Sequence, residues 1–75
     1  MTEQEIIELL KKESEEFKKL DEEHRNLKNT LVEIDRKVYL TTEEEVERKK
    51  LQKLKLIKKD RMAELIREYR KGRSN

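Results

Sequence analysis

The hydrophobic residues between positions 6 and 38 follow the a and d spacing of a coiled-coil helix. Positions that alternate steps of four and three residues are apolar at Ile6, Leu10, Phe17, Leu20, Leu27, Leu31, Ile34 and Val38, with Glu13 and His24 between them. We therefore expect an amphipathic helix over about residues 3–38, which begins at a capping box formed by Thr2 and Glu5. The alternative is a break near Ser14, whose hydroxyl can cap a second helix.

The stretch YLTTEEE, residues 39–45, ends this pattern and predicts a turn over residues 39–42. Thr42 and Glu45 have the spacing of a capping box, and acidic side chains are favourable at a helix N-terminus. A second amphipathic helix is expected over residues 43–71, with a frayed tail over residues 72–75.

Two amphipathic helices joined by a short turn pack as an antiparallel hairpin. With the turn near residue 40, residues whose numbers sum to about 82 face each other. The predicted seam, the line of contact between the helices, contains Phe17, Leu20, His24, Leu27, Leu31, Ile34, Leu51, Leu54 and Leu65. The fold class is all-α: one domain over residues 1–75, a two-helix antiparallel coiled-coil hairpin with a short N-terminal helix if the chain breaks at Ser14.

Composition agrees with long helices and excludes several other classes of protein. Charged residues make up 51% of the 75 residues, hydrophobic residues only 32%, and there is no Cys or Pro. Disulfides and thiolate zinc sites are excluded, and no apolar run approaches the roughly 20 residues of a membrane span. We expect a cytoplasmic protein with no membrane contact and no cofactor or metal.

The charges are divided unevenly along the chain. Residues 1–40 hold 8 basic and 11 acidic side chains, whereas residues 41–75 hold 12 basic and 7 acidic ones. An acidic half and a basic half suit two helices that lie side by side, although each exposed ion pair contributes only about 0–1 kcal/mol.

Two segments resemble the YdcH-like family of small uncharacterised bacterial proteins. The segment ESEEFKKLDEEHRNLKNTL matches the family spacing at Glu13, Phe17, Leu20, His24 and Leu27, and KLIKKDRM matches at Lys55, Leu56, Lys59, Asp60 and Met62. The match covers most of residues 10–66. The chain departs from the family at Ser14-Glu15, where members often carry Asn-Pro. The resemblance implies a helical hairpin in the bacterial cytoplasm and no established activity.

His24 is the only histidine and the residue most easily mistaken for a catalytic group. A metal site needs further ligands, and a general base needs a nucleophile in a sheltered pocket, neither of which a two-helix rod supplies. We therefore predict no catalytic, metal-binding or cofactor-binding residue. We interpret His24 as a packing residue of the seam, and predict that it pairs with Asp60 across the hairpin.

A second set of apolar residues lies beside the predicted seam. Val32 and Tyr39 on the first helix, and Leu56, Ala63 and Ile66 on the second, form a stripe that the hairpin leaves uncovered. We expect a second copy to cover this stripe, with a dimer favoured, and an unknown protein partner as the alternative. The sequence thus predicts a non-enzymatic protein–protein interaction module or adaptor.

The basic stretch ERKKLQKLKLIKKDR, residues 47–61, supports a different function. Its lysines and arginines are suited to the phosphates of RNA or DNA, as in a nucleic-acid or ribosome-associated protein. No aromatic residue stacks among them and the other half of the chain is acidic, so nucleic-acid binding is the alternative and not the favoured interpretation.

Overall fold

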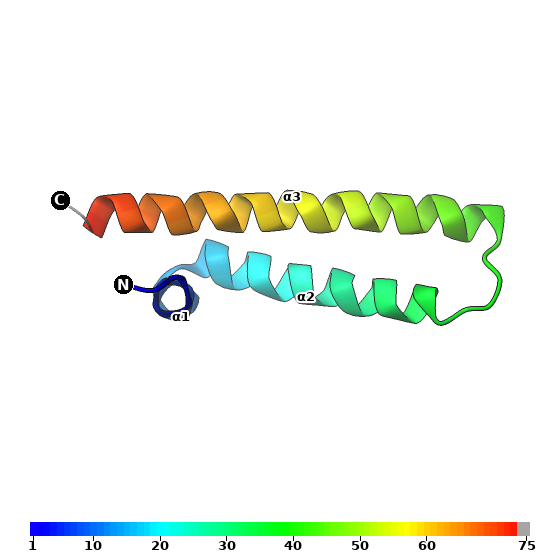
Figure 1. Cartoon of the computed structure of the whole chain (residues 1–75), viewed down its shortest axis with the longest axis horizontal. Helices are drawn as coiled ribbons and strands as arrows, with labels where there is room; N and C mark the ends of the chain where they lie inside the picture. The colour runs from blue at the N-terminus through cyan, green and yellow to red at the C-terminus, as the bar shows by residue number, and fades with distance from the viewer. Residues whose placement is uncertain (74–75) are drawn as a thin grey trace.

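The computed structural model describes residues 1–73, which form three helices: α1 (Glu3–Glu13), α2 (Glu15–Asp35) and α3 (Thr42–Arg73). α2 and α3 run antiparallel side by side, and α1 lies across the open end of this hairpin, where it is seen end-on (Figure 1). The molecule is a rod with dimensions of 52 × 20 × 16 Å. The expected all-α hairpin is confirmed, and the short N-terminal helix is present.

Ser14 separates α1 from α2 by acting at both helix ends. Its backbone is extended, with φ −112° and ψ 113°, and its amide donates a hydrogen bond to the carbonyl of Leu10 in the last turn of α1. Its hydroxyl accepts a hydrogen bond of 3.1 Å from the amide of Phe17 in the first turn of α2. The serine thus makes the helix boundary without a proline.

The break places the hydrophobic core at the α1 end of the rod. Phe17 is completely buried and packs with Ile6 and Leu10 from α1. Four residues of α3 close the cluster from the other side: Met62, Leu65, Ile66 and Tyr69. The prediction that Ile66 lies on the uncovered stripe is therefore wrong, because α1 brings a third apolar surface against this part of α3.

The first helix of the hairpin ends earlier than predicted, at Asp35 instead of about residue 38. Val38 and Tyr39 are each 87% exposed, so no burial of apolar surface extends the helix through them. α3 begins at Thr42, capped by Thr41 and not by Thr42 as the sequence suggested. The Thr41 hydroxyl accepts from the Glu44 amide, and the Glu44 carboxylate accepts from the Thr41 amide.

The seam of α3 also differs from the prediction. The half-buried positions follow steps of four and three residues along Glu44, Arg48, Leu51, Lys55, Lys58, Met62, Leu65 and Tyr69. Lys55 and Lys58 therefore occupy seam positions, whereas Leu54, predicted there, is 44% exposed. Lysine stems supply apolar methylene groups to a seam while the ammonium groups reach solvent at its edge.

α3 continues to Arg73, two residues beyond the predicted end, because Gly72 has an ordinary negative φ and does not terminate the helix. Gly72 therefore belongs to the helix and not to the frayed tail. Residues 74 and 75 of that predicted tail lie outside the described residues. None of the three helices, over the residues described, is long and apolar enough to cross a membrane.

Candidate functional site

Ten exposed residues define one side of α3, which we call the outer face. They recur at steps of about three or four and are Val46, Lys49, Lys50, Lys53, Leu56, Ile57, Asp60, Ala63, Glu64 and Arg67. At about 100° per residue, they lie opposite the seam positions of the same helix. Three aliphatic side chains of the outer face, Val46, Leu56 and Ile57, are each more than half exposed.

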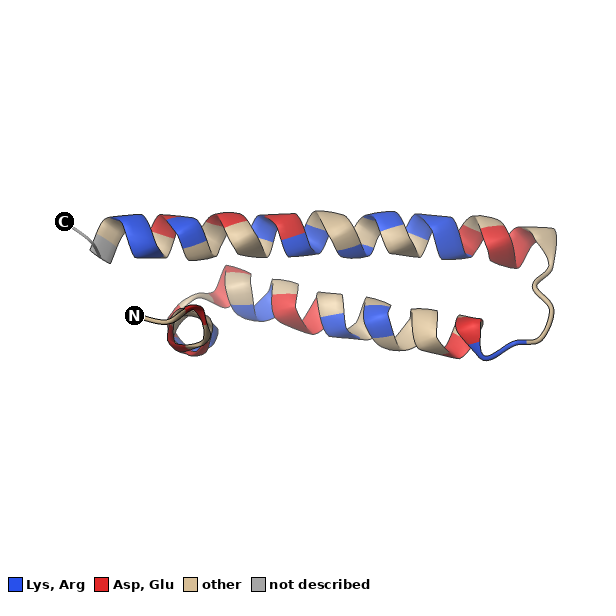
Figure 2. Cartoon of the chain, viewed as in Figure 1, with Lys and Arg blue, Asp and Glu red and all other residues tan. Residues whose placement is uncertain are grey.

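The lysines of the outer face have no acidic neighbour in ion-pair distance. Lys49, Lys50 and Lys53 form no ion pair with any residue that the structure describes, and the same holds for Asp60. Basic residues dominate the middle of α3, as Figure 2 shows by the blue segments of that helix. The outer face therefore presents aliphatic groups and charges that are free to contact another molecule.

The charges that do pair hold the hairpin together along its length. Lys58 contacts Glu23 at 3.2 Å, and the Nε atom of Arg48 donates a 2.7 Å hydrogen bond to Asp35. Lys37 pairs with Glu44 next to the turn, and the hydrogen bond from Lys37 lowers the pKa of Glu44 below its usual value. These pairs use side chains at the edges of the seam, and Lys49, Lys50, Lys53 and Asp60 on the outer face have no ion-pair partner among the described residues.

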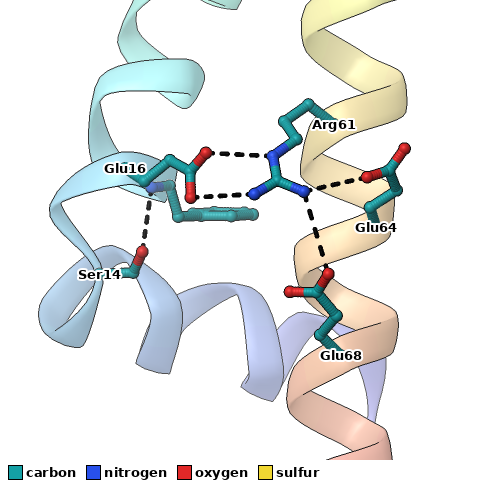
Figure 3. Close-up of polar contacts among 6 residues, drawn as sticks. Ser14, Glu16, Arg61, Glu64 and Glu68 are labelled. Atoms are coloured by element: carbon teal, nitrogen blue, oxygen red, sulfur yellow. Dashed lines mark hydrogen bonds and ion pairs between the residues drawn. The ribbon is translucent and has the colours of Figure 1, made fainter.

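Arg61 is the most highly connected of these side chains (Figure 3). Its Nε and Nη2 atoms donate hydrogen bonds of 3.0 and 3.2 Å to the two carboxylate oxygens of Glu16. Its Nη1 atom also donates to Glu64 at 3.0 Å and lies 3.9 Å from Glu68. The hydrogen bond to Glu16 is the main reason that the pKa of Arg61 is raised, and this bidentate contact fixes the register of α2 on α3 near the core.

His24 lies in the seam, and its Nε2 atom is buried without a hydrogen-bond partner among the described residues. Burial lowers the pKa of His24, and the ammonium groups of Lys55, Lys59 and Lys28 lower it further, while Asp21 opposes them. This environment disfavours the protonated imidazole.

The predicted pairing of His24 with Asp60 is wrong. No hydrogen bond or ion pair joins the two residues in the described chain, and Asp60 is exposed. Asp60 is two residues from both Lys58 and Met62, so it points roughly 200° away from the seam. The predicted register brought Asp60 within a turn of His24 along the axis, but not onto the side of α3 that faces α2.

Only some residues of the predicted second stripe lie on the same surface of the structure. Leu56 and Ala63 are exposed on the outer face of α3, whereas Ile66 belongs to the core. Val32 is exposed on α2, and Tyr39 lies in the turn at the far end of the rod. The structure therefore does not bring Val32 and Tyr39 together with Leu56.

Sequence reasoning missed Val46, Leu54 and Ile57 as exposed residues: it placed Leu54 in the seam and did not assign Val46 and Ile57 to the uncovered stripe. The signal that identifies them is the strict alternation of four and three residues through Leu51, Met62, Leu65 and Tyr69. Two positions of that spacing are lysines, Lys55 and Lys58. The aliphatic residues next to them make the spacing hard to recognise in the sequence.

No group of three or more His, Cys, Asp or Glu side chains within residues 1–73 is arranged to hold a metal ion. The site is thus an exposed helical face, and the class of protein is a small helical hairpin with a short N-terminal helix.

A model of the family described as "Protein of unknown function (DUF465)" matches residues 17–66. The chain belongs to this family of YdcH-like small uncharacterised proteins, as the resemblance predicted. No curated protein and no solved structure gave a match.

Proposed function

We propose that the protein is a non-enzymatic protein–protein interaction module that binds through the outer face of α3. The observation that carries the proposal is the exposure of Leu56 and Ile57, at 55% and 54%, next to Lys53 and Asp60, which have no ion-pair partner in the described part of the chain. Both residues lie in the middle of the longest helix, where the rod is only two helices thick. An aliphatic surface of this kind, rimmed by charge, is typical of helix-to-helix recognition.

The rest of the molecule holds α3 in place and so supports the outer face. Phe17 and its neighbours fix α1 and α2 to one end of α3, and the ion pairs of Arg61 and Lys58 set the register along it. A rigid helix lowers the conformational entropy lost on binding, so the framework favours association through a preformed surface.

Site-specific photo-crosslinking tests this proposal. A photoreactive amino acid replaces Leu56 on the outer face or, as the control, Lys18 on the exposed side of α2. The protein is irradiated in the cytosol of its own cell. We expect protein adducts at position 56, either with a second copy or with another protein, and far fewer at position 18. Equal adducts at the two positions, or no protein adduct at position 56, would overturn the proposal.

Nucleic-acid binding is the second candidate, favoured by the unpaired Lys49, Lys50 and Lys53. A generic single-stranded RNA titrated at low salt separates the two functions. Affinity that falls steeply as salt rises supports RNA binding, because neutralised phosphates release counterions. No binding at low salt removes this candidate.

A further inference from the structure

The outer face of α3 carries opposite charges on the two sides of a hydrophobic centre. Lys49, Lys50 and Lys53 precede Leu56 and Ile57 along the helix, and Asp60 and Glu64 follow them, with Val46 and Arg67 at the two ends of the face. The three lysines and Asp60 have no ion pair with any residue that the structure describes, and Glu64 contacts Arg61. A surface with this order of charges is complementary to a second copy of itself that runs in the opposite direction.

We propose that the protein forms a twofold symmetric dimer in which the outer faces of two α3 helices pack antiparallel, with the axis between Leu56 and Ile57. The inference rests on the proposed function, because it names the occupant of the same surface. It adds the identity of the partner, the direction of packing and the register.

The register follows from the positions of the outer-face residues. With the axis between residues 56 and 57, facing residues have numbers that sum to about 113. Most outer-face residues then lie level with another outer-face residue of the second copy: Leu56 with Ile57, Lys53 with Asp60, Lys49 with Glu64 and Val46 with Arg67. Four aliphatic side chains lie at the centre, and two ion pairs lie on either side of them.

Other occupants fit this surface less well. A parallel dimer would bring Lys49 and Lys53 against their own equivalents, which is repulsive. An anionic membrane or a nucleic acid would attract Lys49 and Lys53 but would meet the carboxylates of Asp60 and Glu64 at the other end of the face. The pattern of charge therefore favours an antiparallel copy.

Charge reversal with rescue tests the pairing of Lys53 with Asp60. Analytical ultracentrifugation of the full chain at about 100 µM measures the dimer constant. In K53D, both symmetric pairs become repulsive, and we expect the dimer to weaken roughly tenfold or more. D60K has the same effect by the same reasoning. The double variant K53D/D60K restores attraction at both sites, so its dimer constant is expected within about threefold of the wild type.

K18D is the matched control, because Lys18 is an exposed lysine of α2 outside the outer face. It should leave the dimer constant unchanged. Lys53 and Asp60 are exposed and have no ion-pair partner among residues 1–73, so the helix content of all variants is expected to match the wild type by circular dichroism. A wild-type dimer that neither single reversal weakens, or that the double variant does not restore, overturns the proposed interface.

A distance between spin labels on the two copies tests the direction of packing. The chain lacks cysteine, so a single spin label at Val46 reports one distance between the two copies. In the proposed register the labelled positions are 21 residues apart along the axis, which corresponds to about 32 Å. A parallel dimer would place them about 10 Å apart and would refute the antiparallel arrangement.

The outcomes separate this inference from the proposed function. A wild-type chain that remains a monomer at every salt concentration overturns the dimer. If position 56 nevertheless crosslinks to a different protein, the interaction module stands with another occupant. If position 56 crosslinks to no protein, the dimer and the proposed function both fail.

Discussion

The burial of Phe17 gives the sharpest prediction about the fold. This side chain has no exposed surface, and it is enclosed by Ile6 and Leu10 from α1 together with residues of α3. It belongs to the only cluster of buried residues in the described chain that joins all three helices. Phe17→Ala should therefore undo the packing of α1 and weaken the hairpin at the same time.

The expected loss is large compared with the stability of so small a protein. Truncation of a buried Phe to Ala typically costs about 3–5 kcal/mol, from lost transfer free energy and the cavity left behind. A hydrophobic core of this size seldom gives more than about 3–5 kcal/mol of net stability. We expect Phe17→Ala to be largely unfolded at 25 °C, whereas Phe17→Leu, which fills most of the space, should lose roughly 1–2 kcal/mol.

Urea unfolding followed by circular dichroism at 222 nm measures these losses. Val38→Ala is the matched control, since Val38 is highly exposed in the turn and its truncation should change the free energy of unfolding by less than about 0.5 kcal/mol. The reasoning is refuted if Phe17→Ala unfolds at the wild-type urea concentration, or if Phe17→Leu costs no more than Val38→Ala.

Two further predictions concern the helix break and the seam. Ser14→Ala removes the hydroxyl that accepts from the Phe17 amide, and should cost about 1 kcal/mol in urea unfolding, while Ser14→Asp should retain the cap; equal losses would contradict the capping role. The pKa of His24, followed by NMR, should lie below its usual 6.5. The unfolded chain then takes up its proton at a higher pH than the folded one, so stability falls as pH drops from about 6.5 to the lowered pKa and is constant below it. His24→Leu should remove this contribution to the pH dependence, and an unchanged slope would count against the assignment.

The parts of the fold that the sequence predicted correctly depend on short-range chemistry. The capping box of Thr2 and Glu5 was predicted and is present, because each residue bonds to the backbone of the other three positions away. The break at Ser14 was the alternative to an expected continuous helix, and the Ser14 cap that allows the break is present. The antiparallel pairing followed from a short turn between two amphipathic helices and is confirmed.

The seam of α3 was predicted poorly because its sequence offers competing apolar stripes. Leu51, Leu54, Leu56 and Ile57 fall on different sides of the helix, and local spacing does not decide which side meets α2. Contacts distant in sequence decide it: the core at Met62 and Leu65 fixes one end, and the pair of Glu23 with Lys58 fixes the middle. These contacts depend on the position of α1, which the heptad pattern does not specify.

The same contacts explain why aliphatic side chains lie on the outer face of α3. Once Lys55 and Lys58 occupy the seam, Leu56 and Ile57 must lie on other sides of the helix, since neighbouring residues are separated by about 100°. The seam thereby loses aliphatic contacts, and Leu31 is the one buried residue of the described chain in the half of the hairpin next to the turn. The middle of the hairpin therefore has few apolar contacts between α2 and α3. The aliphatic side chains that would have filled the seam are exposed on the outer face. A second copy packed on that face would bury them and stabilise the central part of α3 that the hairpin itself supports least, so folding and association would be thermodynamically linked.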